Sequence, residues 1–304
     1  MNKSILIFVL VTALTFVNIF VSYANEVDGP YNQQEAIQPD ECKLSMKEED
    51  KKIMEYIKSI ELNPDNADAH YNLGLLYEKK RKYNDAVLEY TKAINIKSDL
   101  IEARLKLALV YAEMNMHSES VFELKRLLEI EPQNATAYKY MGIAYYEKGF
   151  PEKAISELKR AIELNPDDAE IHYALENVYY SMGLVDDAKE ELRKSIKLNP
   201  EYKEAYNNLG FIYYEEGKFD EAMKQFKTVI EIDSKFVEAY SNMGMVYCEK
   251  GMFDEAIPIL KKAIEINPTF PDAHSNLGYA YWKKGLKDKA MREVSIFKQL
   301  TGEK

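Results

Sequence analysis

The chain has 304 residues and a mass of 35.2 kDa, and its 46% hydrophobic and 30% charged residues are typical of globular proteins rather than of disordered or collagen-like chains. Its 40 Lys and Arg residues are outnumbered by 51 Asp and Glu residues. The resulting net charge of −11 argues against binding to nucleic acid or to an anionic membrane surface, because both require basic protein surfaces.

The N-terminal segment has the features of a secretory signal. A single positive charge precedes an apolar run over residues 5–21, and Ser22 and Ala24 place small side chains ahead of Asn25. We therefore predict a signal peptide over residues 1–24 and secretion across the inner membrane into the periplasm. The alternative is an uncleaved anchor that leaves the chain facing the periplasm, although the run is shorter than the roughly 20 residues that span a bilayer.

Residues 25–46 follow as a polar and acidic stretch. They include Pro30 and Pro39 and show no apolar periodicity. A stretch of this composition offers little apolar surface to bury, so we predict a flexible acidic tether between the signal and the remainder of the chain.

From residue 47 to residue 304 the sequence repeats with a period of 34 residues. The marker is a Pro or Ser near the end of each unit, at Pro64, Ser98, Pro132, Pro166, Pro200, Ser234 and Pro268. A fixed period of this length predicts a stacked solenoid. Seven full units then start at residues 67, 101, 135, 169, 203, 237 and 271. A partial unit with one helix, over about residues 47–62, precedes them.

Each full unit contains signals for two helices, here called helix A and helix B. Position 15 is Gly in five units, which suits the left-handed backbone that ends a helix, whereas Arg81 and Asn115 replace it in the first two. We predict that polar residues at position 18 cap helix B, namely Asn84, Ser118, Asp186, Asp220, Asp254 and Asp288. The residue at position 32 then ends helix B.

Small and large residues recur at fixed positions inside the unit. Position 8 is Gly or Ala in six units, position 20 is Ala or Ser in all seven, and position 11 is always Tyr. Such a pattern predicts two interdigitated helices in each unit. Glu176 occupies position 8 of its unit, so we predict a weak joint there and a higher melting temperature for Glu176→Gly.

This pattern resembles the tetratricopeptide repeat (TPR). The unit that begins at residue 203 shows the resemblance best, with Tyr206, Leu209, Gly210, Tyr213, Ala222 and Phe226. The resemblance covers residues 47–304 and implies an all-α fold, an α-α superhelix (TPR solenoid) of seven full helix-turn-helix units and a partial N-terminal unit. It also implies a concave groove that is lined by the A helices and binds a peptide, a helix or another protein.

Positions 4, 7, 8 and 11 of helix A lie on one arc of the helix and pack inside the unit, whereas positions 2, 5, 6, 9, 12 and 13 lie on the opposite arc. The resemblance implies that this opposite arc faces the groove. Aromatic and apolar residues on the arc are predicted to contact a ligand: Tyr146, Tyr180, Tyr214, Trp282, Phe211, Met245 and Tyr279. For position 9, which includes Phe211, Met245 and Tyr279, packing against the next unit is an equal alternative.

Polar residues on the same arc suggest what the ligand is. Asn208, Asn242 and Asn276 at position 6 resemble the asparagine ladder of O-linked N-acetylglucosamine transferases, which implies hydrogen bonds to a ligand backbone, although Asn is also common at this TPR position. Late acids at position 13 oppose the helix dipole and so call for another explanation: Glu147, Glu215 and Glu249, together with Glu113. We predict a ligand with basic and apolar anchors.

No residue pattern indicates catalysis, a cofactor or a metal site. His70, His172 and His274 all occupy position 4, an aromatic packing position, and lie three units apart, too far to share a metal ion. Cys42 and Cys248 are too few for a disulfide framework and too distant in an extended array to bridge each other.

The sequence therefore predicts a non-catalytic, extracytoplasmic protein-protein interaction scaffold. The alternative is a component of a polysaccharide-export or envelope assembly that contacts sugar chains through groove aromatics. Phe297 replaces a small residue at position 27 of the last helix. That helix is predicted either to end the array or to receive a second copy of the chain as a homo-oligomer contact.

Overall fold

The computed structural model describes residues 48–302, and within that range it contains fifteen α-helices and no strand. The predicted signal peptide, the predicted tether and Cys42 lie outside the described residues. The chain divides into two units, residues 1–52 and residues 53–304. Apart from the first residues of α2, the helices described below belong to the second unit.

The helices match the predicted repeat. Their bounds are α2 (Glu48–Leu62), α3 (Ala67–Lys79), α4 (Tyr83–Ile96), α5 (Ile101–Glu113), α6 (His117–Ile130), α7 (Ala135–Glu147), α8 (Pro151–Leu164), α9 (Ala169–Ser181), α10 (Val185–Leu198), α11 (Lys203–Glu215), α12 (Phe219–Ile232), α13 (Val237–Glu249), α14 (Phe253–Ile266), α15 (Pro271–Lys283) and α16 (Lys287–Thr301). All seven A helices, α3 to α15 by odd numbers, begin at the predicted unit starts. The all-α repeat fold is confirmed.

The turn between the two helices of a unit behaves as predicted. Each of the five glycines at position 15 has a φ between 72° and 77°, and Arg81 and Asn115 adopt the same left-handed region with φ of 56° and 58°. Glycine reaches this region without steric cost, whereas a side chain such as that of Arg81 is strained there. The turn thus keeps the same backbone conformation in the two units that have no glycine at position 15.

The predicted caps of the B helices are wrong. In all seven B helices the N-cap residue lies two residues before position 18, and its side chain makes no capping hydrogen bond. Three of the position 18 side chains instead accept a hydrogen bond from a lysine of the next unit, in the pairs Lys148–Ser118, Lys250–Asp220 and Lys284–Asp254. These residues therefore join neighbouring units rather than start a helix.

The two helices of a unit approach most closely at position 8. In four units a Cβ built on this glycine would lie 2.3–2.7 Å from a large side chain of helix B, namely Tyr90, Leu158, Phe226 or Leu260. These four side chains have no solvent exposure. The absence of a Cβ at position 8 is thus what lets a large residue at position 24 fill the core of the unit.

Position 4 ties each A helix to the preceding turn. His70, His172 and His274 are buried, and their Nε2 atoms lie 3.0–3.3 Å from the carbonyl oxygen six residues earlier. Their Nδ1 atoms lie 2.5–2.7 Å from a glutamate nineteen residues later. For His172 this contact with Glu191 raises the pKa of the imidazole. The histidines are structural residues of the core.

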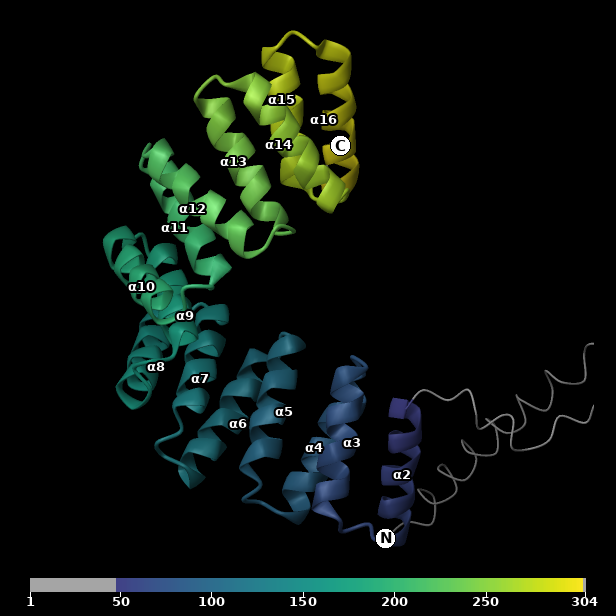
Figure 1. Cartoon of the computed structure of the whole chain (residues 1–304). Helices are drawn as coiled ribbons and strands as arrows, with labels where there is room; N and C mark the ends of the chain where they lie inside the picture. The colour runs from purple at the N-terminus through teal and green to yellow at the C-terminus, as the bar shows by residue number, and fades with distance from the viewer. Residues whose placement is uncertain (1–47, 303–304) are drawn as a thin grey trace, which may run out of the picture. The chain divides into compact units, whose positions relative to one another are not determined.

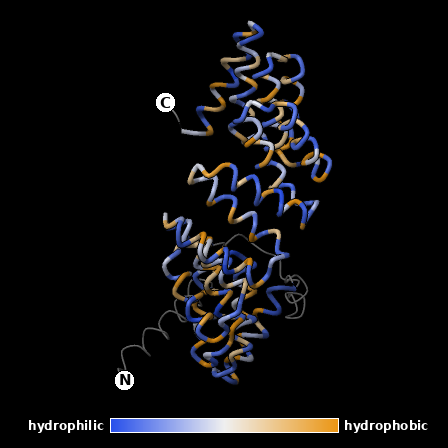
Figure 2. The backbone as a smooth tube through the Cα atoms, turned by 90° about the vertical axis from the view of Figure 1, so that its left-hand side faces the viewer, coloured by the Kyte–Doolittle hydropathy of each residue, from blue (hydrophilic) through white to orange (hydrophobic). Residues whose placement is uncertain are grey.

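Successive units stack mainly through helix B of one unit and helix A of the next (Figure 1). From α4 onward each even-numbered helix contacts the odd-numbered helix that follows it, and the A helices also contact one another directly, as α5 with α7 and α13 with α15 do. Figure 2 shows hydrophobic and hydrophilic residues mixed along every helix, as expected where one face of each packs inward. One face of every A helix is thus directed toward a surface that neighbouring units share.

The close approach at position 8 yields a testable contrast between Gly244 and Gly278. A Cβ on Gly244 would lie 2.3 Å from Leu260, whereas on Gly278 the nearest side-chain atom is 3.3 Å away. We expect Gly244→Ala to destabilise the protein by about 1–3 kcal/mol because a buried side chain must move. Gly278→Ala should be neutral or stabilising by about 0.5 kcal/mol, since alanine favours helix. Denaturant unfolding of both variants measures the difference, and equal effects would contradict this account of the packing.

Candidate binding groove

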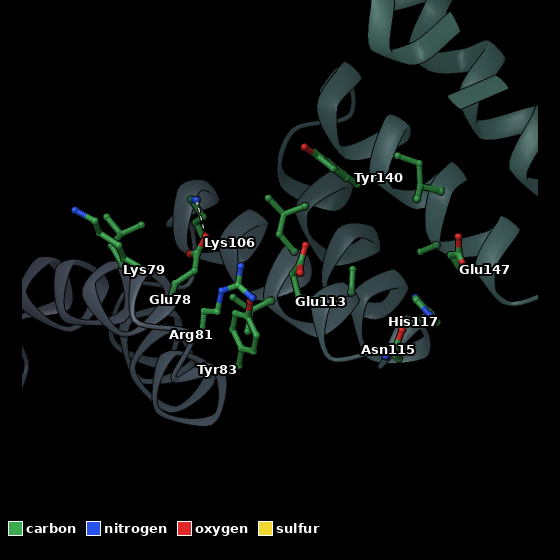
Figure 3. A pocket seen from close by; sticks show the side chains of 16 residues that line it. Glu78, Lys79, Arg81, Tyr83, Lys106, Glu113, Asn115, His117, Tyr140 and Glu147 are labelled. Atoms are coloured by element: carbon green, nitrogen blue, oxygen red, sulfur yellow. Dashed lines mark hydrogen bonds and ion pairs between the residues drawn. The ribbon is translucent and has the colours of Figure 1, made fainter. Parts of the chain in front are cut away.

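A hollow of about 970 Å³ opens between α3, α5 and α7, on the surface that their predicted groove-facing arcs share (Figure 3). Its apolar lining comes from position 9 of three successive A helices, Leu75, Leu109 and Ile143, each of which is half-buried. Polar side chains labelled in Figure 3, among them Glu113 and Glu147, surround this floor. Position 9 therefore lines a concave surface in these three units.

A second hollow of about 390 Å³ lies between α7 and α9. It shares Tyr140, Ile143 and Glu147 with the first, so the two hollows meet along α7. Tyr146 and Tyr173 add aromatic area to its lining. We call the combined surface the α3–α9 groove; it offers the concave and mostly apolar lining that peptide and ligand sites have.

The charges of the first hollow are unevenly distributed. Near α3, Glu78 accepts hydrogen bonds from Lys106 at 3.1 Å and from the Tyr90 hydroxyl at 2.5 Å, so its charge is compensated. Glu113 and Glu147 are exposed and have no ion-pair partner among the described residues. An uncompensated negative field therefore lies over the α5–α7 part of the groove.

The second hollow is held in shape by a buried lysine. Lys139 has only 7% exposure and donates hydrogen bonds to Glu170 at 2.7 Å and to Asp168 at 3.2 Å. Burial opposes its charge, but these two carboxylates outweigh that cost and raise the pKa of the Lys139 ammonium. The side chain thus links α7 to the start of α9 and is not available to a ligand.

The asparagine ladder is used within the protein. The Nδ2 atom of Asn208 donates to Glu176 at 3.1 Å, that of Asn242 donates to Asn207 at 3.0 Å, and that of Asn276 lies 3.3 Å from the Ser241 hydroxyl. Each bond joins an A helix to the A helix before it. These Nδ2 atoms therefore stabilise the stacking of units, and their predicted hydrogen bonds to a ligand backbone stay a prediction.

The other predicted groove residues are divided among several places. Tyr146 and Glu147 line the α3–α9 groove. Tyr180 donates a hydrogen bond to Glu215 at 2.6 Å, and burial together with this bond raises its pKa to about 12.

The remaining predicted residues lie on later helices. The ring of Tyr214 lies 6.1 Å from that of Phe211 and 5.9 Å from that of Phe219. Met245 is half-buried and Glu249 exposed on α13. Tyr279 and Trp282 line a separate hollow on α15 and α16. None of the thirteen predicted residues is buried, but they do not form one site.

The sequence prediction missed the most enclosed part of the groove. Tyr140, Tyr173 and Tyr202 line the second hollow, yet they occupy positions 6, 5 and 34, which vary in type from unit to unit. Leu75, Leu109 and Ile143 could have been found, since position 9 is apolar in most units. The repeat pattern does not reveal which units surround a hollow, because that depends on how each unit stacks on the next.

The comparison with family models decides the classification. A model described as TPR repeat matches residues 53–81, 151–183, 177–217, 212–251 and 244–285, and a model described as Tetratricopeptide repeat matches residues 101–134. Together these matches cover more than half of the chain. The chain belongs to the tetratricopeptide repeat family. Both models describe repeats, and neither describes a catalytic domain.

Solved structures show the same fold. This TPR protein is similar to a chain of the APC/C hetero-tetramer Cut9–Hcn1, with 18% identity and a TM-score of 0.64 over 83% of this chain and 50% of that chain. It is also similar to PilF of Pseudomonas aeruginosa, with 20% identity and a TM-score of 0.59. The match covers 68% of this chain and 94% of PilF.

A third similar structure is YrrB, which is described as a TPR protein with an unusual peptide-binding site. Its sequence identity is 27% and its TM-score 0.47, and the match covers 60% of this chain and 95% of YrrB. No curated protein sequence matches the chain.

Residues 48–302 offer neither a metal-binding cluster nor a membrane-spanning helix. No group of three or more His, Cys, Asp or Glu side chains lies close enough together to hold a metal ion in this part of the TPR protein. No helix there is both long enough and apolar enough to cross a membrane. Cys248, the free cysteine that the structure describes, is buried, and burial raises the pKa of its thiol to about 11.

Glu176 is a buried carboxyl group at the junction of α9 and α11. Its exposure is 1%, and the amide of Asn208 supplies its hydrogen bond. Burial raises the pKa of Glu176 to about 7, well above its ordinary value of 4.5. The side chain does not reach solvent, so this junction contains an ionisable group where most units have glycine.

The stability of the protein should depend on pH through Glu176. Between pH 4.5 and about 7 the unfolded chain loses this proton while the folded chain keeps it, so the contribution of Glu176 to stability is highest below pH 4.5 and falls as pH rises toward 7. The shift corresponds to a loss of about 3 kcal/mol. Glu176→Gln should remove this part of the pH dependence, and urea unfolding of both proteins at several pH values measures it. If the free energy of unfolding changed with pH in the same way in both proteins, the raised pKa of Glu176 would be contradicted.

Proposed function

We propose that this TPR protein is a non-catalytic, extracytoplasmic scaffold whose α3–α9 groove binds a protein segment with apolar and basic anchors. The observation that carries the proposal is the continuity of the two hollows along α7, with an apolar floor and two exposed carboxylates. Apolar residues of a ligand would fill the floor, and a Lys or Arg would lie over Glu113 and Glu147.

The groove suits an extended or helical segment better than a compact small molecule. Its lining comes from four successive A helices, so contacts are spread along the stack rather than gathered around one point. Long shallow surfaces of this kind are typical of peptide recognition, in which a few anchors supply most of the affinity. The description of YrrB as a peptide-binding TPR protein concerns that protein and is consistent with this proposal.

A random peptide library displayed on phage tests the groove. We expect selected sequences to be enriched in Lys or Arg next to Leu, Ile, Phe or Tyr. Ile143→Asp should weaken the binding of a selected synthetic peptide by roughly tenfold or more, because it places a charge on the floor that both hollows share. Isothermal titration calorimetry measures the change.

Two further variants make this test specific. The double reversal Glu113→Lys/Glu147→Lys should abolish the preference for basic peptides and the salt dependence of binding. Leu88→Asp is the matched control, because Leu88 is 53% exposed on α4 and does not line either hollow. Sequences without basic enrichment, or undiminished binding by Ile143→Asp, would overturn the proposed ligand.

The extracytoplasmic location rests on residues 1–24 alone. We expect the full chain, expressed in a bacterium with a secretory pathway, to be exported and cut before Asn25. Intact-mass spectrometry of the product, after separation of periplasm, membrane and cytoplasm, measures both. A full-length product in the membrane fraction would support the anchor instead, and a full-length soluble product in the cytoplasm would contradict export.

A further inference from the structure

The last helix pair has an uncovered apolar hollow of its own. A space of about 760 Å³ lies between α15 and α16, and its lining includes Tyr279, Trp282, Met291 and Val294. Trp282 is 58% exposed and Met291 68%, which is unusual for two large apolar side chains so close together. This surface, which we call the terminal hollow, is separate from the α3–α9 groove.

The last unit is also less completely filled than the others. In four other units a Tyr, Leu or Phe at position 24 lies against the glycine of position 8. Here position 24 is Val294, and its Cγ2 atom is 3.3 Å from the position that a Cβ on Gly278 would take. The shorter side chain leaves the space that its larger equivalents occupy.

The shape of the missing partner follows from the unit before it. On α14, Ile257, Leu260 and Ile264 occupy positions 21, 24 and 28 and belong to one core cluster with residues of α15. Helix α15 therefore covers them. The equivalent residues of α16 are Met291, Val294 and Lys298, and within the described residues no helix covers them. One helix, lying on α16 as α15 lies on α14, fits this surface.

The charges around the terminal hollow indicate which kind of helix would bind there. Residues 271–301 contain six Lys and Arg against three Asp and Glu, whereas the whole chain has a net charge of −11. Lys298 lines the hollow at a position that is Ile or Leu in all six earlier full units. A second copy of the same face would bring two basic surfaces together, and a basic helix would be repelled as well.

We propose that the terminal hollow binds a single amphipathic helix of a partner protein, apolar on one face and acidic along its flanks. Its apolar side chains cover Trp282, Met291 and Val294, and its acids lie near Lys283 and Lys298. The hollow is concave, which favours an inserted helix over a flat lipid surface. This binding is independent of the ligand proposed for the α3–α9 groove.

Trp282 is the one tryptophan in the chain and gives a direct readout. The probe is a side-chain-stapled peptide of residues 237–249 with Cys248→Ser, the chain's own helix A with two acids and no base. In the full chain its Ala239, Met243 and Val246 pack on α12. We expect titration of the full-length protein with this peptide, at low salt, to shift the Trp282 emission to shorter wavelength and to reduce quenching by acrylamide.

Variants on both sides test the proposed contacts. Met291→Asp should weaken binding roughly tenfold or more without unfolding the protein, since the residue is mostly exposed. The peptide with Glu238→Lys and Glu249→Lys should bind roughly tenfold more weakly, and Lys283→Glu/Lys298→Glu in the protein should restore its binding. Leu88→Asp on α4 is the unchanged control, and circular dichroism confirms the fold of each variant.

Four results would overturn the proposal. The first is no change of Trp282 emission at saturating peptide, and the second is equal binding by Met291→Asp or by the charge-reversed peptide. The third is a shift of the Trp282 emission that appears when the protein concentration is raised without peptide, together with a doubled mass in light scattering. A second copy of the chain would then occupy the hollow. The fourth is protection of Trp282 by anionic phosphatidylglycerol vesicles and not by the peptide, which would assign the surface to lipid.

Discussion

The structure depends on the close approach of helix A and helix B at one point in every unit. Gly74, Gly142, Gly210 and Gly244 leave room for a large side chain of helix B, and a fully buried alanine or serine at position 20 completes the contact. Because this contact recurs every 34 residues, it fixes the register of both helices. The opposite arc of helix A is then the only one left to face neighbouring units and a ligand.

Three units depart from this rule, at Ala108, Glu176 and Val294, and the last two of these have unusual properties. Glu176 replaces glycine, so the unit buries a carboxyl group that only Asn208 of the next helix satisfies. Val294 is smaller than its equivalents and lies farther from the glycine of position 8 than they do. Both departures cost packing that the other units have. A repeat protein can tolerate such local costs because each unit mainly contacts its neighbours, and the loss does not spread.

Most of the fold could be predicted from the sequence, and much of the site could not. Helix bounds were predictable because glycine at position 15 and the residue at position 32 act locally. The capping role of Asp220 was wrong because its side chain bonds to Lys250 of the next unit. The bond between Asn242 and Asn207 of the preceding unit was likewise not predicted. These bonds join residues that are 30 or 35 positions apart in the sequence. Such contacts depend on how one unit stacks on the next, and the residue pattern within a unit does not reveal this.

The two proposed surfaces select opposite charges, and this has a consequence for how the protein assembles with others. In these proposals Glu113 and Glu147 favour a basic segment in the α3–α9 groove, whereas Lys298 and Lys283, which lies over the ring of Tyr279, favour an acidic helix at the terminal hollow. A partner suited to one surface is repelled by the other, so the two sites do not compete for the same segment. The surfaces also lie on different units, so binding at one leaves the lining of the other exposed. One stack of repeats can therefore hold two different proteins at the same time.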